Sequence, residues 1–282
     1  MSLVVNFNSS AYNAHRNLQG TNRSLQSSIA HLSSGMRVNS ASDDPSGLVI
    51  SEDMRAQADG LGQAIRNAND GTNLVKTAEA SLNEVHSLLR QMRTLALHAA
   101  NTGVNSTEAT DADQAALDKA VASIDRIATT TQFNGKNLLD GSYTDQSFQI
   151  GSNSTDTETI NITTDMTNGG DALDSAGLGI DALDLSTADD AAAAIDAIDT
   201  AITTISTVRS DLGSFQKNTL ESTINSLSIA QENIRASEST IRDADMAAEM
   251  VEFTRNNIML QAGTAMLAQA NAAPQTVLQL LR

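Results

Sequence analysis

The chain has 282 residues and a formal net charge of −17, and its composition excludes several kinds of protein. Aromatic residues make up only 2% and Trp is absent, so the core must consist of aliphatic side chains, as in long helices packed closely together. The lack of Cys excludes disulfides and thiolate metal sites. No run of about 18 apolar residues occurs, and the N-terminal residues lack the pattern of a cleaved signal peptide, so we expect no membrane insertion.

Charge is distributed unevenly along the chain. Residues 137–208 contain 13 acidic residues and no Lys or Arg, whereas residues 1–42 and 253–282 contain Arg but no acidic residue. The centre of the chain is therefore expected to face water, and both ends are expected to lie in a more apolar setting. Because no stripe of Lys and Arg is available to displace phosphate counterions, the pattern excludes nucleic acid as a partner.

The N-terminal half has the periodicity of three helices. The first apolar stripe ends near Gly35, the second helix starts at about Asp44 and continues to Asn101, and the third follows a turn-like segment. The stripe residues are Leu18, Leu25, Ile29, Leu32 and Met36 in the first helix, Leu61, Ile65, Ala68, Thr72, Val75, Leu82, Val85, Leu89, Met92 and Ala96 in the second, and Leu117, Val121, Ile124 and Ala128 in the third. The stripe of the second helix spans roughly 60 Å, and a rod of that length cannot bury its apolar stripe alone.

The middle of the chain carries turn and strand signals. Two dipeptides favour positive φ: Asn134-Gly135 and Asp140-Gly141. Together with short alternating segments they predict a small β-hairpin region between about residues 132 and 165. Residues 166–186 are rich in Gly, Asp and Thr without a period, so a loop or small cap is expected. Helix resumes near Thr187, whose side chain suits an N-cap.

The C-terminal half ends in an unusually apolar helix. A seam with a seven-residue repeat runs through Leu220, Leu227, Ile234 and Ile241, with Ile224 beside it, and the polar residues Gln231 and Glu238 interrupt it. After residue 243 the sequence is apolar around most of the helix and contains four Met. We expect this helix to be buried between subunits, with Met serving adaptable packing rather than metal binding.

The stretch LSSGMRVNSASDDPSGLVIS, residues 32–51, separates the first two helices. Asp43, Asp44 and Ser46 have the ligand atoms that a hard cation prefers, but their spacing matches no calcium loop. Asp44 followed by Pro45 is instead the pairing of a helix N-cap with a first helical residue. We therefore predict a structural joint between two helices. Its residues are Gly35, which ends a helix, Arg37, which is expected to pair with Asp43 or Asp44, and Asn39, Asp43, Asp44, Pro45 and Gly47.

Sequence motifs for catalysis are lacking. The four His form no HExxH pair, and neither a GxSxG elbow nor a P-loop occurs. His86 and His98 are expected to be solvated. We therefore predict no enzyme activity, no metal site and no cofactor.

Three stretches resemble bacterial flagellin, in that family's order and at its distances from the termini. They are LSSGMRVNSASDDPSGLVIS (32–51), QFNGKNLLDG (132–141) and IRDADMAAEMVEFTRNNIMLQAGTAMLAQANAAPQTVLQLLR (241–282), and the resemblance covers about residues 1–150 and 187–282. It implies a mainly α fold in which the N- and C-terminal segments pair as long coiled-coil-like helices, with a small β-hairpin region. It also implies a structural subunit that polymerises into the flagellar filament for motility, through head-to-tail contacts that generate an open helical polymer.

The implied organisation has five parts. Residues 1–43 form an N-terminal filament-core helix and joint, and the resemblance implies that the joint contributes to subunit contacts in assembly. Residues 44–165 form one half of a helical shell with the β-hairpin. Residues 187–242 form the other half, and residues 243–282 form a C-terminal filament-core helix. Residues 166–186 are left as a short variable surface loop, so the large outer domains that many flagellins carry are nearly absent.

The resemblance also implies partners and a location. The chain is expected to bind copies of itself, a flagellar export chaperone, the type III export apparatus, and the filament cap and hook-junction proteins, and to be secreted into an extracellular filament. The residues assigned to the filament core and to chaperone binding are Met246, Met250, Val251, Ile258, Met259, Met266, Leu278, Leu281 and Arg282.

One helix aligns with the surface that Toll-like immune receptors contact in the family. In LLRQMRTLALHAAN, residues 88–101, Arg93 and Leu95 match the family pattern LQRVRELAV, and Arg90 lies beside them. Gln91 stands in place of an Arg, and Ala116 on the next helix stands in place of a Glu. Loss of these charged groups removes charge-assisted hydrogen bonds and argues against receptor recognition.

Alternatives come from other classes of protein. A hook–filament junction protein shares similar terminal helices, but the full QFNGKNLLDG motif and the long C-terminal match favour flagellin. A cytoplasmic coiled-coil signalling rod would carry charged heptads through both ends, whereas both ends here lack acidic residues. An adhesin or immune-receptor ligand is the third alternative, and a receptor reporter assay would distinguish it.

Overall fold

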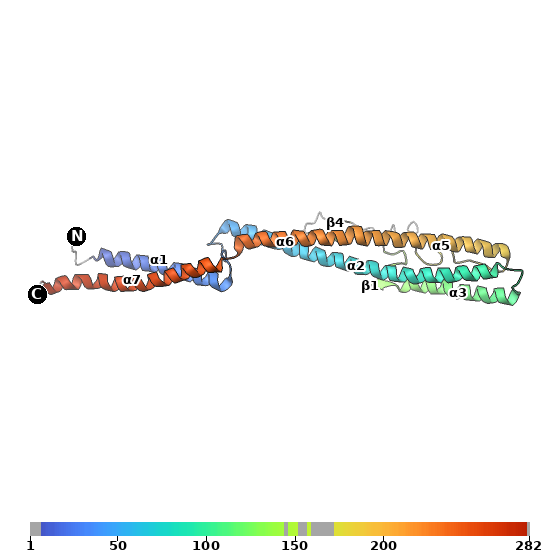
Figure 1. Cartoon of the computed structure of the whole chain (residues 1–282), viewed down its shortest axis with the longest axis horizontal. Coiled ribbons are helices and arrows are strands. Elements are labelled where there is room, and N and C mark those ends of the chain that lie inside the picture. The colour runs from blue at the N-terminus through green and yellow to red at the C-terminus, as the bar shows by residue number, and fades with distance from the viewer. Residues whose placement is uncertain (1–6, 144–145, 152–156, 159–171, 281–282) are drawn as a thin grey trace. The chain divides into compact units, whose positions relative to one another are not determined.

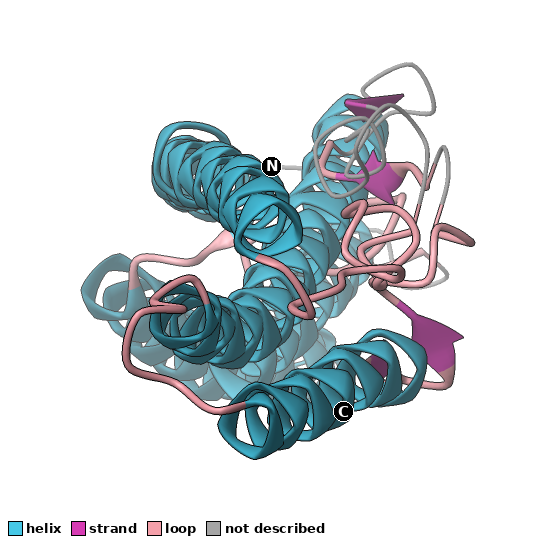
Figure 2. Ribbon diagram, turned by 90° about the vertical axis from the view of Figure 1, so that its right-hand side faces the viewer, coloured by secondary structure: helices cyan, strands magenta, loops and turns pink. Residues whose placement is uncertain are grey.

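The computed structural model describes residues 7–143, 146–151, 157–158 and 172–280, with only the backbone for 157–158 and 273–280. The fold is mainly helical, as predicted, with a small β region (Figures 1 and 2). The helices are α1 (Ser9–Ser34), α2 (Pro45–Ala99), α3 (Thr107–Thr130), α5 (Ala188–Ser214), α6 (Ser222–Arg242) and α7 (Met246–Leu280). Two compact units are formed: unit 1 comprises Met1–Gln57 with Glu232–Arg282, and unit 2 comprises Ala58–Gln231.

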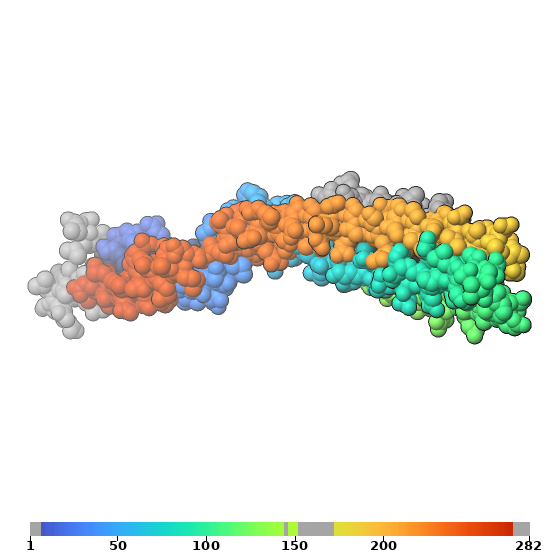
Figure 3. Space-filling view, turned by 45° about the vertical axis from the view of Figure 1, so that its right-hand side comes forward, coloured from blue at the N-terminus to red at the C-terminus, as the bar shows by residue number. Residues whose placement is uncertain are grey.

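Unit 1 is built on the antiparallel pairing of α1 with α7 (Figures 1 and 3). The Asn8 side-chain amide donates a 2.7 Å hydrogen bond to the Ala270 carbonyl, and at the other end His31 Nδ1 lies 3.6 Å from a carboxylate oxygen of Glu249. The least exposed residues of both helices recur at alternating steps of three and four, which is the coiled-coil repeat. They are Ala11, Ala14, Leu18, Thr21, Leu25, Ser28 and Leu32 in α1, and Phe253, Asn256, Leu260, Gly263, Leu267 and Ala270 in α7.

The predicted place of Ile29 on this seam is wrong. Ile29 is 49% exposed, whereas Ser28 is 2% exposed. The alternating step from Leu25 reaches residue 28 rather than 29, so the seam contains small and polar side chains that let the helices approach closely. A Cβ added at Gly263 would lie only 2.8 Å from Leu18 Cδ1, which shows how close the contact is.

Unit 2 is centred on α2, whose buried face follows the same repeat over twelve positions. They are Leu61, Ala64, Ala68, Gly71, Val75, Ala78, Leu82, Val85, Leu89, Met92, Ala96 and Ala99. Ile65 and Thr72 were expected on this face but are only half-buried, because Ala64 and Gly71 occupy it instead. A Cβ at Gly71 would lie 3.4 Å from Cε1 of Phe148 and 3.6 Å from Cδ2 of Leu220, so small residues permit a close approach of neighbouring segments.

Helix α5 packs into the same core through a buried face of small and branched residues: Ala191, Ala194, Ile198, Ala201, Ile205, Val208 and Leu212. Helix α3 adds Leu117, Ala120, Ile124 and Ala128. By length and composition alone, the run Ala188–Arg242 is the one helix among the described residues apolar enough to cross a membrane. The buried residues of its α5 part belong to this core, so packing within unit 2 accounts for the apolar composition of that part.

A π-helical segment, η2 (Phe215–Glu221), joins α5 to α6 and was not predicted. The buried steps of three and four in α5 end at Leu212, and the half-buried Phe215 is followed by Leu220, 0% exposed, five residues later. A π-helix makes hydrogen bonds five residues apart, so the wider turn keeps both side chains directed toward the core. The spacing of five is the signal in the sequence that indicates this segment.

The β region consists of two short antiparallel pairs. Strand β1 (Gln132–Phe133) pairs with β2 (Lys136–Asn137), and β3 (Phe148–Gln149) pairs with β4 (Thr157–Glu158). In the first turn Asn134 has φ 50° and Gly135 has φ 79°, which are the positive values that a two-residue hairpin requires. The hairpin prediction is therefore confirmed for the described residues, while most of residues 152–165 lie outside them.

The described part of the predicted surface loop, residues 172–186, is largely packed into unit 2. Leu173 and Ile180 are 0% exposed, and Leu185 is 1% exposed. The Leu173 N–H donates to the Leu139 carbonyl at 2.9 Å, which fixes the segment against the loop after β2. The expectation of a surface loop is wrong for this part, because its scattered Leu and Ile cover the core although they show no helical or strand period.

Candidate subunit-contact site

The joint, residues 35–47 and 241–245 of unit 1, is formed by two helix ends and two helix starts. Gly35 ends α1 with φ 71°, and its N–H donates to the His31 carbonyl at 2.8 Å. Asp44 caps α2 through Oδ1, which accepts hydrogen bonds from the N–H groups of Ser46 (3.1 Å) and Gly47 (2.9 Å). The predicted helix boundaries at Gly35 and Asp44 are confirmed.

Asp43 holds the loop between the helices together. Its Oδ2 accepts from the N–H groups of Asn39 (3.1 Å) and Ser40 (2.9 Å) and from the Ser40 hydroxyl (3.0 Å). The hydrogen bond from the Ser40 N–H, aided by the others, lowers the pKa of the Asp43 carboxyl below its ordinary value. Both aspartates therefore bind backbone N–H groups, and nowhere in the described ranges do three or more His, Asp or Glu side chains gather as a metal site.

The predicted ion pair of Arg37 is wrong. Its guanidinium donates to the carbonyl of Ile241, and its backbone N–H donates to the carbonyl of Arg242 at 2.7 Å. The carboxylate of Asp43 is already occupied by the turn, while the last carbonyls of α6 have no partner inside their own helix. Arg37 therefore joins the N-terminal half of the chain to the C-terminal half.

Backbone contacts complete this junction. Met36 and Asp243 form an antiparallel bridge, and the Ala244 N–H donates to the Gly35 carbonyl at 2.9 Å. Arg242 makes a 2.6 Å ion pair with Glu52. Asp245 caps α7 by accepting from the N–H groups of residues 247 (2.9 Å) and 248 (3.2 Å).

The roles of Arg242, Asp243 and Asp245 were missed in the sequence. The motif IRDAD was recognised only as part of a longer match. The signal that could have found one role is Asp245 ahead of an apolar helical run, which repeats the capping pattern of Asp44.

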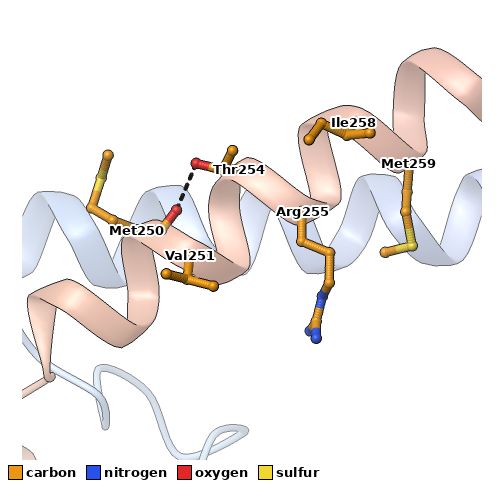
Figure 4. Close-up of a pocket in the computed structure, with 6 residues that line it drawn as sticks. All are labelled: Met250, Val251, Thr254, Arg255, Ile258 and Met259. Carbon is orange, nitrogen blue, oxygen red and sulfur yellow. Dashed lines mark hydrogen bonds between the residues drawn. The ribbon is translucent and has the colours of Figure 1, made fainter.

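Large apolar side chains of α7 are exposed in the single chain, and most of them lie off the stripe that faces α1. Their exposed fractions are 47% for Met246, 50% for Met250, 70% for Val251, 62% for Ile258, 44% for Met259 and 64% for Met266. A shallow groove of about 500 Å³ is lined by Met250, Val251, Thr254, Arg255, Ile258 and Met259 (Figure 4). The side chain of Leu278 is not described, and Leu281 and Arg282 lie outside the described residues. We call the six exposed residues, Met246 to Met266, the outward face of α7.

The residues aligned with the receptor-binding pattern lie in unit 2. Arg93 makes two hydrogen bonds to the carboxylate of Asp199 on α5, with Nε–Oδ1 at 2.6 Å and Nη2–Oδ2 at 3.2 Å. The Arg93 guanidinium lowers the pKa of the Asp199 carboxyl. Arg90 and Gln91 are exposed, whereas Leu95 packs against the core. Ala116, on α3, is half-buried.

The two histidines expected to be solvated differ in the structure. Nδ1 of His98 lies 2.6 Å from a carboxylate oxygen of Asp113. His86 is half-buried, and its Nδ1 is buried and has no hydrogen-bond partner among the described residues. Burial, together with the positive charges of Arg90 and Arg209, lowers the pKa of His86.

These features define a class of protein: a mainly helical subunit whose first and last helices pair and leave an apolar face for further association. Comparison with known proteins places it more narrowly. The family model of the bacterial flagellin N-terminal helical region matches residues 5–144, and that of the C-terminal helical region matches residues 195–281. The chain belongs to the bacterial flagellin family.

Similar proteins extend over the full length. The chain is 47% identical over 282 residues to a flagellin of Halalkalibacterium halodurans, with 99% of this chain and 100% of that protein covered. It is 44% identical over 307 residues to a flagellin of Bacillus subtilis (99% and 99%) and 41% identical over 296 residues to the flagellar filament 33 kDa core protein of Treponema phagedenis (99% and 100%). A crystal structure of Bacillus cereus flagellin, 31% identical, covers 57% of this chain and 88% of that chain with a TM-score of 0.48.

The family and the full-length relatives establish the function predicted from the sequence. The chain is a structural subunit of the bacterial flagellar filament, which is a homopolymer, and not an enzyme. A hook–filament junction protein and a cytoplasmic signalling rod are not favoured.

Proposed function

We propose that the outward face of α7 and the joint are the surfaces through which this chain contacts neighbouring copies in an extracellular filament. The observation that carries the proposal is the exposure of Met246, Met250, Val251, Ile258, Met259 and Met266 on one helix. Apolar side chains gathered at this density favour transfer out of water. A second copy is the occupant that a homopolymer supplies.

The charge pattern supports part of these surfaces. Residues 1–42 and 253–282 carry no acidic residue, so α1 and the part of α7 after residue 252 can meet another copy without carboxylate repulsion despite the net charge of −17. The contact is heterologous, because the outward face of one copy meets a different surface of the next. Repetition of such a contact generates an open helical polymer.

The finer partners follow from the same surfaces. The chain is secreted through the flagellar type III apparatus, an export chaperone covers the outward face of α7 before assembly, and cap and hook-junction proteins contact the terminal helices. Cell fractionation tests secretion: the protein should be recovered from sheared surface material, and recovery only from cytosol would contradict it. Chaperone binding should be lost when Val251 is changed to Glu.

Recognition by Toll-like receptors is proposed to be weak. Arg93 is already engaged with Asp199, and Gln91 lacks the charge that the family pattern has at that position. A receptor reporter assay should give little signal for the natural chain and more for Gln91→Arg. A strong signal from the natural chain would contradict this view.

The central experiment compares two valines in polymerisation of the purified chain, observed by negative-stain microscopy. Val251 on α7 is 70% exposed, and the control Val104, in the loop between α2 and α3, is exposed by 82%. Val251→Glu should strongly reduce filament formation, because the contact would have to bury a carboxylate among apolar side chains. Val104→Glu adds the same charge to unit 2 and should polymerise normally. Normal filaments from Val251→Glu would refute the proposed contact.

A further inference from the structure

Methionines are concentrated on the outward face of α7. The chain contains nine Met, and four of them, Met246, Met250, Met259 and Met266, are between 44% and 64% exposed on this one helix. Met92, in contrast, is 0% exposed in the core of unit 2, and Met36 and Met54 are half-buried. Thioether sulfur is the most readily oxidised group available in a chain without Cys, so exposure separates the methionines into accessible and protected ones.

We propose that these four methionines are a reversible oxidation site at which a peroxide-class oxidant controls whether the free subunit can join a filament. The inference rests on the proposed function, because it requires the outward face to become buried between copies. Oxidation is selective for the unassembled chain, since burial in the contact removes the sulfur atoms from solvent.

The chemistry needs no group beyond the oxidant. A sulfur lone pair attacks one peroxide oxygen, the O–O bond breaks and an S–O bond forms. With hydrogen peroxide, proton transfer completes the departure of water: sulfur is oxidised by two electrons and the peroxide is reduced. A methionine sulfoxide reductase returns the thioether: two thiols are oxidised to a disulfide, and the sulfoxide oxygen leaves as water, which makes the change reversible.

The groove shows why a sulfoxide would interfere. Met250 and Met259 line it beside Val251 and Ile258 (Figure 4). Two neighbouring groups have partners of their own: the Thr254 hydroxyl donates to the Met250 carbonyl at 2.8 Å, and Nη2 of Arg255 donates to Glu252. A sulfoxide oxygen buried here against apolar side chains of a second copy loses its hydrogen bonds to water, which opposes association.

The test uses full-length chain treated with hydrogen peroxide in two forms, free subunits and preformed filaments. Peptide mass spectrometry should show sulfoxide at the four α7 methionines of the free subunit before Met92 reacts, and protection of the same residues in filaments. The treated subunit should need a protein concentration at least about tenfold higher to polymerise, and treatment with methionine sulfoxide reductases A and B should restore it. Normal polymerisation of subunits carrying these sulfoxides, or failure of the reductases to restore it, would overturn the proposal.

The matched variant replaces Met246, Met250, Met259 and Met266 with Leu, which has a similar volume and cannot be oxidised. It should polymerise with or without peroxide, and loss after treatment as large as that of the natural chain would overturn the inference. If the fourfold variant fails to polymerise without treatment, the double variant Met250→Leu with Met259→Leu takes its place. Its polymerisation should be partly resistant to peroxide, and a loss as large as that of the natural chain would overturn the inference. Untreated Val251→Glu tests the contact itself, so failure of the proposed function is distinguished from failure of the oxidation site.

Discussion

Ile180 tests whether the segment 172–186 is part of the core of unit 2 or a removable surface loop. Its side chain is 0% exposed, and its N–H donates to the Ser175 carbonyl at 2.9 Å. Ile180→Ala removes three carbon groups without changing the backbone. At about 0.8 kcal/mol for each buried group, the transfer cost alone is about 2.4 kcal/mol. The remaining cavity raises the expected destabilisation above this value, to at most about 5 kcal/mol.

Equilibrium unfolding by urea, followed by far-UV circular dichroism, measures this loss of free energy. The control is Ile229→Ala in α6, because Ile229 is 61% exposed and should change stability by less than about 0.5 kcal/mol. The midpoint for Ile180→Ala should fall while the slope of the transition stays the same. Equal midpoints for the two variants would refute the argument and return the segment to the status of a surface loop.

Three further predictions concern the joint and the half-buried His86. Gly35→Ala should destabilise the fold by about 1 to 2 kcal/mol through the backbone strain at φ 71° alone, because an added Cβ meets no atom within 4 Å. It should also speed hydrogen exchange of the Ala244 N–H and reduce filament yield. Gly35→Asn should have a smaller effect, and equal effects of the two variants would contradict the backbone argument. Asp44→Ala should lower the free energy of unfolding by about 0.5 to 2 kcal/mol and speed hydrogen exchange of the Gly47 N–H, which loses its acceptor. Asp44→Asn keeps a side-chain oxygen that can accept the same hydrogen bond. Unchanged hydrogen exchange in the Ala variant would exclude capping by Asp44. The pKa of His86 is lowered in the folded state, so the unfolded chain binds a proton first as the pH falls. The stability contributed by His86 should therefore be constant above about pH 6.5 and decrease below that pH. His86→Gln should weaken this pH dependence, and an identical pH profile in the variant would assign the dependence to other groups.

Local chemistry made much of the fold predictable. Gly35, Asp44 and the Asn134-Gly135 turn act through their own backbone preferences, and each was found where predicted. The seams were harder to predict, because Ala64 and Gly71 face the core while their larger neighbours Ile65 and Thr72 are only half-buried. Where helices approach closely through small residues, a search for large apolar residues misses part of the buried face.

The errors have a common physical source in contacts between distant parts of the chain. Arg37 bonds to Ile241, and residues 172–186 cover a core formed by helices on both sides of them in the sequence. No local period encodes either arrangement. The candidate contact site was predictable as an apolar helix, whereas the bonds from Met36 to Asp243 that anchor it required the structure.

The junction of Met36 with Asp243 has a consequence for the order of folding. Closing a loop of about 200 residues directly is entropically unfavourable, and the cost grows with loop length. Unit 2 is one continuous segment, and its own fold holds Gln231 beside Ala58 through a 2.9 Å hydrogen bond from the glutamine amide to the alanine carbonyl. Once this unit has formed, only two short arms remain to be joined. The pairing of α1 with α7 therefore costs less loop-closure entropy once unit 2 has formed, and the helix pair that carries the outward face of α7 forms last.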